Sequence, residues 1–238
     1  MMIRKFAFAA AAAAAFTAAF AAPEEEGDVS GQGVGAIGWT PVQIGLFAPV
    51  SYPWGCDWDL KGFGLDLFYT ENVRLQGMAI SGVAARSRDE RKGLFVTGLC
   101  NWSEEDVYGV DLTLGLNLAF KDVYGIEAGL FGMRRRMDGL DIHFLGSHQV
   151  GYRGVQLAGL CNFTLEDFTG ADVALGLNMA KDMTGAQLGG INFAHRLTGC
   201  QIGFFNIAEE CPGGIQLGLV NIIMDNKIKV LPITNFYF

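Results

Sequence analysis

The sequence predicts an all-β repeat fold of the β-solenoid type, with about 13 short strands in units of 14 to 16 residues. Three observations carry this prediction. Glycine-led units return at regular intervals, residues inside a unit alternate with a period of two, and no stretch keeps a helical period. An up-and-down outer-membrane β-barrel would use similar strands and is the alternative.

The first residues of the chain are typical of an export signal. Arg4 and Lys5 precede an unbroken apolar run, and Ala19-Phe20-Ala21 has the small-x-small pattern that signal peptidase accepts. A membrane anchor is the alternative, but the run is shorter and richer in alanine than a spanning helix requires. We therefore predict a signal peptide at residues 1–21 and an exported protein.

The rest of the chain is acidic and rich in glycine. Without Arg4 and Lys5 it has 15 basic and 25 acidic residues, a formal charge of −10. Such a chain is repelled by nucleic acid and by anionic lipid surfaces, so we expect no nucleic-acid partner. We assign residues 22–40 to an acidic, glycine-rich segment and residues 41–238 to a single β-repeat domain.

The repeat is clearest between Gly185 and Ile222, where the phrase G-x-Q-x-G-x-x-N is written three times. Similar units begin upstream, and the phrase keeps the same polarity in each copy. This favours a solenoid with one or two units per coil over a barrel, in which successive strands reverse direction. The structural repeat positions are Gln187, Asn192, Gln201, Asn206, Gln216 and Asn221.

The alternation within a unit predicts which side chains share a face. In residues 109–120, Val110 and Leu112 belong to one set, and Asp111 and Asn117 belong to the other. We expect the apolar set to fill a narrow core and the Gln, Asp and Glu side chains to form a polar ladder on an outer face. On this assignment Leu217→Asp costs several kcal/mol, whereas Gln201→Ala costs about 1 kcal/mol or less.

Glycine and asparagine have separate expected roles in the units. The spacing from the leading Gly to Asn changes by one residue between units, so its parity relative to Gln changes as well. This suggests a turn corner, where Asn adopts the left-handed conformation and bonds the stacked backbone. The leading Gly is expected to supply a positive φ or a close approach of two backbones.

The C-terminus supports the alternative fold. The stretch VLPITNFYF ends in Phe238, much as the last strand of an outer-membrane barrel ends in an aromatic residue. Pro232 inside this stretch and the short connections between units argue against a barrel. Membrane association is expected only if the barrel alternative holds.

The phrases GAQLGGIN, GCQIGFFN and GIQLGLVN, together with VQIGLFAP and VLPITNF, resemble a family of bacterial surface-repeat proteins built from G-x-Q-x-G-x-x-N units. The resemblance covers most of the chain after the first 40 residues. It implies placement in the envelope or at the cell surface, and it implies no activity. Gly132 and Gly146 depart from the pattern because they stand where Asn is expected.

Residues that could carry chemistry are scattered. His143 shares a face with Asp141, so the two either pair or point to solvent, and Arg134 to Arg136 form either a solvated turn or a docking point for an anion. Among the five cysteines, we predict a disulfide between Cys200 and Cys211. We expect no catalytic, cofactor or metal site. The function predicted is that of a non-enzymatic exported envelope protein, structural or partner-binding, whose surface partner the sequence does not identify.

Overall fold

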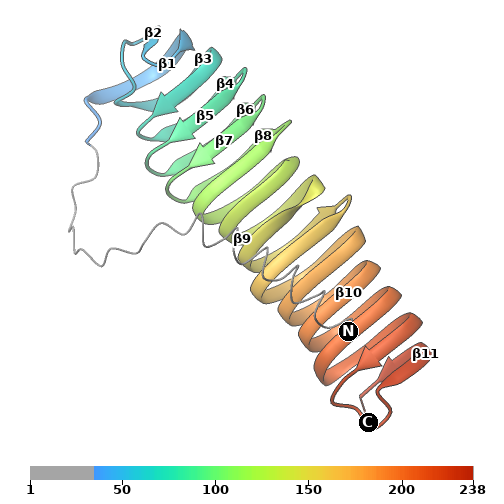
Figure 1. Cartoon of the computed structure of the whole chain (residues 1–238). Helices are drawn as coiled ribbons and strands as arrows, with labels where there is room; N and C mark the ends of the chain where they lie inside the picture. The colour runs from blue at the N-terminus through green and yellow to red at the C-terminus, as the bar shows by residue number, and fades with distance from the viewer. Residues whose placement is uncertain (1–34, 238) are drawn as a thin grey trace. The chain divides into compact units, whose positions relative to one another are not determined.

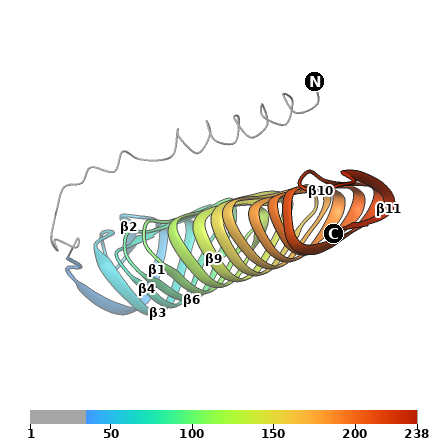
Figure 2. The same ribbon diagram turned by 90° about the horizontal axis from the view of Figure 1, so that it is seen from below.

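A computed structural model describes residues 35–237 and confirms an all-β solenoid (Figure 1). The strands stack side by side in successive coils around one axis, as the view from below also shows (Figure 2). The predicted signal peptide and residues 22–34 of the predicted acidic segment lie outside the described residues.

Hydrogen bonding continues through many of the corners. The strands are β1 (Gly38–Phe47), β2 (Val50–Tyr52), β3 (Trp58–Asn72), β4 (Leu75–Ser81), β5 (Ala84–Ser87), β6 (Arg91–Thr97), β7 (Cys100–Ser103), β8 (Val107–Thr113), β9 (Leu116–Ala158), β10 (Cys161–Ile223) and β11 (Val230–Phe236). Where the sequence suggested separate short strands, β9 and β10 run for 43 and 63 residues through several coils.

Each repeat unit makes one coil. Gly62 of β3 pairs with Gly77 of β4, which pairs with Gly93 of β6, and all these pairings are parallel. The same register continues through β8 into β9. The alternative of an up-and-down barrel is wrong, because neighbouring strands in that arrangement run antiparallel.

A column of leading glycines holds the coils together closely. Gly185 has a φ of 128°, and a Cβ on it would collide with the carbonyl oxygen of Gly170 in the coil before. Only glycine combines this conformation with this approach at no steric cost. Both roles expected for the leading glycine are therefore confirmed.

The apolar core fills one part of the coil interior. Buried apolar side chains stack from coil to coil, and the rings of Tyr152 and Phe168 lie parallel with centroids 5.1 Å apart. This matches the spacing of about 4.7–4.9 Å between hydrogen-bonded strands. The column continues through Met183, Leu197 and Cys211, and Leu60, Leu75, Ala79 and Phe95 form a smaller core in the first coils.

Both ends of the stack carry an antiparallel strand. At the N-terminal end β2 pairs with β1, and at the C-terminal end β11 pairs with the last turn of β10. A parallel stack would otherwise expose unpaired backbone groups to another chain. The two terminal strands therefore cover part of each end of the solenoid.

Candidate functional site

The repeated glutamines lie inside the coils. Gln187, Gln201 and Gln216 are 0% exposed, whereas Ile202 and Leu217 are 42% and 38% exposed on the outer surface. The predicted outer polar ladder and the predicted apolar filling of this part are therefore wrong. Alternation shows which residues share a face, but the same pattern fits either face toward the interior. We therefore expect Gln201→Ala to lower the stability of the fold more than Leu217→Asp does, the opposite of the order expected from the sequence.

The buried glutamines form a ladder from coil to coil. The amide nitrogen of Gln216 donates to Oε1 of Gln201 at 2.8 Å, and that of Gln201 donates to Oε1 of Gln187 at 2.8 Å. Gln187 in turn donates to the carboxylate of Asp172 at 3.4 Å. The donors thus all point toward the N-terminal end, and Oε1 of Gln216, the last amide of the ladder, is buried without a hydrogen-bond partner in the described part of the chain.

The asparagines form a second ladder with the opposite direction. Nδ2 of Asn192 donates to Oδ1 of Asn206 at 2.8 Å, and Nδ2 of Asn206 donates to Oδ1 of Asn221 at 2.8 Å. Nδ2 of Asn192 and Nδ2 of Asn206 each also donate to a backbone carbonyl of the next coil, and Nδ2 of Asn221 donates to the carbonyl of Leu231 in β11. The predicted left-handed corner is wrong, because Ile233 is the one described residue other than glycine with a positive φ. The corner of the coil takes up the one-residue difference in the spacing from the leading Gly to Asn, so that the Asn side chain lies in the interior in every such unit.

Asp172 lies where the two ladders meet. Its carboxylate accepts from Nδ2 of Asn162 at 2.7 Å as well as from Gln187. Burial raises the pKa of Asp172 to about 7, although these two hydrogen bonds act in the opposite direction. The carboxyl group therefore changes its charge near neutral pH while it is enclosed in the solenoid.

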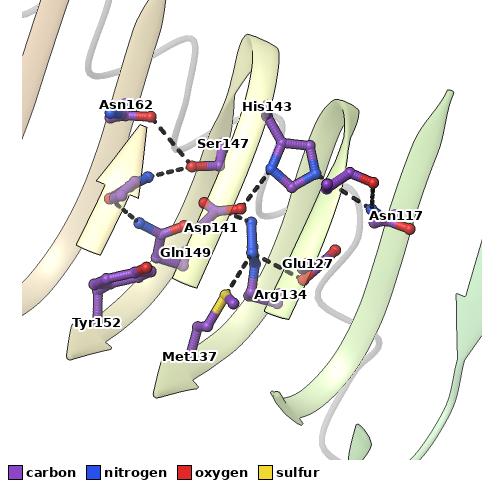
Figure 3. Close-up of polar contacts among 12 residues, drawn as sticks. Asn117, Glu127, Arg134, Met137, Asp141, His143, Ser147, Gln149, Tyr152 and Asn162 are labelled. Carbon is purple, nitrogen blue, oxygen red and sulfur yellow. Dashed lines mark hydrogen bonds and ion pairs between the residues drawn. The ribbon is translucent and has the colours of Figure 1, made fainter. Parts of the chain in front are cut away.

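A cluster of charged side chains occupies the interior in the middle of the chain (Figure 3). Nδ1 of His143 lies 2.5 Å from Oδ1 of Asp141, and its Nε2 lies 3.3 Å from Nδ2 of Asn117. Burial lowers the pKa of His143, so the neutral ring donates from Nδ1 and accepts at Nε2. The predicted His–Asp pair is confirmed, and the solvent-facing alternative is wrong.

Arg134 is the cation of this cluster. It donates from Nη2 to Asp141 at 3.0 Å and from Nη1 to Glu127 at 2.9 Å, and its side chain is 0% exposed. The expectation of a solvated turn or an anion-docking point is therefore wrong for Arg134. Arg135 and Arg136, by contrast, are exposed to solvent.

The units without Asn fill its place with other side chains. A Cβ on Gly132 would collide with Arg134 and His143, so glycine leaves room for the charged cluster. In the next unit, Ser147 donates to Oδ1 of Asn162 at 3.3 Å. Sequence reasoning missed Arg134 and Glu127 as interior residues. The loss of Asn at Gly132 was the signal that something else occupied that space.

The cluster is close to electrically neutral at pH 7. Burial raises the pKa of Glu127 to about 8, and Asp141 adds to this shift, although Arg134 opposes it. Burial alone would also raise the pKa of Asp141, but Arg134 and His143 hold it below its ordinary value. At pH 7 the cluster therefore holds one positive charge, on Arg134, and one negative charge, on Asp141. A His–Asp pair can act as a general base, but here both side chains are 0% exposed and His143 faces an amide. The cluster is therefore enclosed by the coils.

A second buried pair lies toward the N-terminal end. Nη1 of Arg91 is 3.4 Å from Oδ2 of Asp111, Asn101 bridges the two, and the guanidinium lies 4.0 Å from the ring centroid of Phe95. Burial lowers the pKa of Arg91 and raises the pKa of Asp111, because it acts against both charges. Like the central cluster, this pair is enclosed by the coils.

The outer surface has one strongly apolar edge, where each coil turns after its glutamine strand. We define the apolar edge by residues whose side chains are 37–82% exposed: Leu67, Phe68, Val83, Leu99, Leu114, Leu130, Phe144, Leu145, Leu160, Leu175, Phe204, Phe205 and Leu219. Two hollows of about 710 Å³ and 690 Å³ lie beside it, the first walled by Leu114 and Phe144 and the second by Leu175 and Phe204.

On the outer surface, charged residues gather about half a unit after the apolar edge in each coil. A hollow of about 500 Å³ opens there at Gly151. Arg136 and Arg153 line it, but five acidic residues surround them: Asp122, Asp138, Glu166, Asp167 and Asp182. This mixture of charges does not favour an anion such as a phosphate.

The other predicted sites can be placed as well. In residues 35–237, no three His, Cys, Asp or Glu side chains are grouped so that they could hold a metal ion. The predicted disulfide is wrong, since all five cysteines are free, with Cys211 buried in the core and Cys200 beside the leading Gly199 on the outer surface. The described part also has no helix long and apolar enough to cross a membrane.

Comparison with protein-family models, curated proteins and solved structures gives no match. The resemblance to bacterial surface-repeat proteins therefore stays a prediction.

Proposed function

We propose that this chain is a non-enzymatic, exported repeat protein of the bacterial envelope or cell surface that serves as a rigid binding scaffold. The observation that carries the proposal is the apolar edge, which presents large side chains in coil after coil from Leu67 to Leu219. Soluble monomers rarely expose a continuous apolar patch beyond about 300–600 Å², and larger patches mark interaction sites.

The interior supports the same proposal. The titratable side chains of the His143 cluster are packed between coils and bonded to one another, so their chemistry serves the stability of the stack. The ladders fix each coil on the next through 2.8–2.9 Å amide hydrogen bonds. A stack bonded in this way holds its outer side chains at constant spacing, which suits a binding surface.

Export is the part of the proposal that rests on the sequence alone. Cells that carry the native gene are fractionated, and the mass of the protein is determined in each fraction. We expect a chain that begins near Ala22, found outside the cytoplasm. A chain that keeps residues 1–21 and stays in the cytoplasm would contradict the proposal.

A further inference from the structure

The apolar edge defined above has a size that can be compared with known interfaces. Aromatic side chains bury about 150–250 Å² each and aliphatic ones about 100 Å², and the 13 edge residues, four Phe and nine Leu or Val, are 37–82% exposed. The edge therefore exposes on the order of 1,000 Å² of apolar side chain. A stable interface buries about 800 Å² on each partner, and obligate homodimers bury more. One edge is thus large enough for a permanent partner.

We propose that the apolar edge is a homodimer interface, on which a second copy of this chain packs side by side. The inference rests on the proposed scaffold function and names its partner. A copy of the same chain is the one partner certain to carry an equally long apolar edge with the same coil spacing. Two such edges can cover each other in an isologous, closed contact.

The relief of the edge favours a solid partner. Leu114, Phe144 and Leu175 project from the row, whereas Gly159 and Gly190 occupy the same row without a side chain. The two hollows of about 700 Å³ follow this relief. Projections and hollows at fixed spacing can interdigitate with a rigid surface to the packing density of a protein interior. A fluid lipid surface gains nothing from such fixed relief.

The charge pattern also argues against a lipid partner. No Lys or Arg lies within two residues of any edge residue along the chain. Structures that lie on membranes usually combine an apolar face with basic residues that attract anionic lipid. Here the whole chain has a formal charge of −8. An apolar strip without basic flanks is better suited to an identical strip.

The ends of the solenoid favour lateral association. Strands β2 and β11 pair antiparallel with the first and last parts of the stack, so a second copy cannot simply continue the parallel ladder. Growth end to end into a fibre is thereby hindered. Side-by-side pairing through the edge leaves the charged side of both copies in water.

The test is sedimentation equilibrium of the protein expressed with its own N-terminus, compared with two variants. Leu114→Ser/Leu175→Ser changes two edge side chains that are 82% and 81% exposed, so the fold is kept. Arg153→Ser/Arg196→Ser changes two exposed cations away from the edge and is the matched control. Circular dichroism checks that all three chains are folded.

We expect the wild type and the control to be dimers at micromolar concentration and the edge variant to dissociate about 100-fold more readily. A wild type that stays monomeric at about 100 μM would overturn the homodimer. An edge variant that dimerises like the wild type would place the contact elsewhere. A monomer that binds neutral phosphatidylcholine vesicles through the edge would replace the homodimer by a lipid partner. Each of these results leaves the fractionation test of export unaffected, so the two proposals can fail separately.

Discussion

Replacing Gln201 by Ala removes one rung of the glutamine ladder. The side chain makes three hydrogen bonds: it donates to Gln187 at 2.8 Å and to the carbonyl of Ile207 at 3.4 Å, and it accepts from Gln216 at 2.8 Å. Each bond contributes about 1 kcal/mol net, and a buried acceptor left on Gln187 costs a further 1–3 kcal/mol or so. We expect the free energy of unfolding to fall by about 4–6 kcal/mol.

Leu219→Gln is the matched control, because it adds an amide where water can bind it. Leu219 is 66% exposed, and we expect a change below about 1 kcal/mol. Both values come from urea unfolding followed by circular dichroism, in protein dilute enough that association does not contribute to stability. The reasoning on the inner face is refuted if Gln201→Ala costs less than about 1 kcal/mol, or if the two variants cost the same.

Three further variants test other parts of the interior. Gly185→Ala places a Cβ at a residue with a positive φ and against the backbone of Gly170, so it should lower the free energy of unfolding by more than about 2 kcal/mol. Gly213→Ala, with open space around it, is the control and should be neutral in the same urea assay. Arg134→Met leaves the buried carboxylate of Asp141 without its cation and should lower the thermal midpoint by the equivalent of about 3–5 kcal/mol. Arg135→Met, at a 54% exposed side chain, should cost below about 1 kcal/mol. Equal shifts would contradict the buried network. Burial raises the pKa of Asp172 to about 7, above its unfolded value of 3.8, so the folded state binds more protons between these values and stability falls as pH rises from about 4 to 7. Asp172→Asn should flatten this slope in urea unfolding series between pH 5 and pH 8, and an unchanged slope would show that Asp172 does not cause it.

The repeat spacing and the leading glycines were sufficient to predict the architecture. A parallel stack needs a close backbone approach at the same place in every coil, and only glycine permits it, so Gly185 and its equivalents leave a regular signal. The common polarity of the units also pointed to parallel pairing. The glycine positions and the polarity of the units depend on local backbone geometry, so they can be read from the sequence alone.

The faces were harder to predict for a physical reason. A buried Gln is costly unless every polar atom finds a partner, so the sequence of one unit argues for placing Gln201 outside. The partners are supplied by the same position of the neighbouring coils, Gln187 and Gln216, and only the register of the stack reveals this. For the same reason Leu217, apolar in sequence, is left on the surface.

The charged cluster lay beyond what alternation could show. Glu127 and Arg134 belong to one coil and Asp141 to the next, and their contacts depend on how the two coils align. The gap at Gly132 hinted at an exception without naming what filled it. Pairing of His143 with Asp141 was predictable, because the two residues share one face of a single strand.

The constant direction of the two ladders means that the solenoid is modular in length. Every coil in the C-terminal part offers amide acceptors on one side and donors on the other, so any two coils of this kind are compatible. If residues 185–198 were deleted, Gln201 would meet Asp172 as Gln187 does now, and Asn206 would meet Asn178. Whole units can thus be gained or lost by duplication or deletion within a gene while each remaining bond keeps its partner type. The size of the molecule, and with it the length of its apolar edge, is a quantity that evolution can adjust one coil at a time.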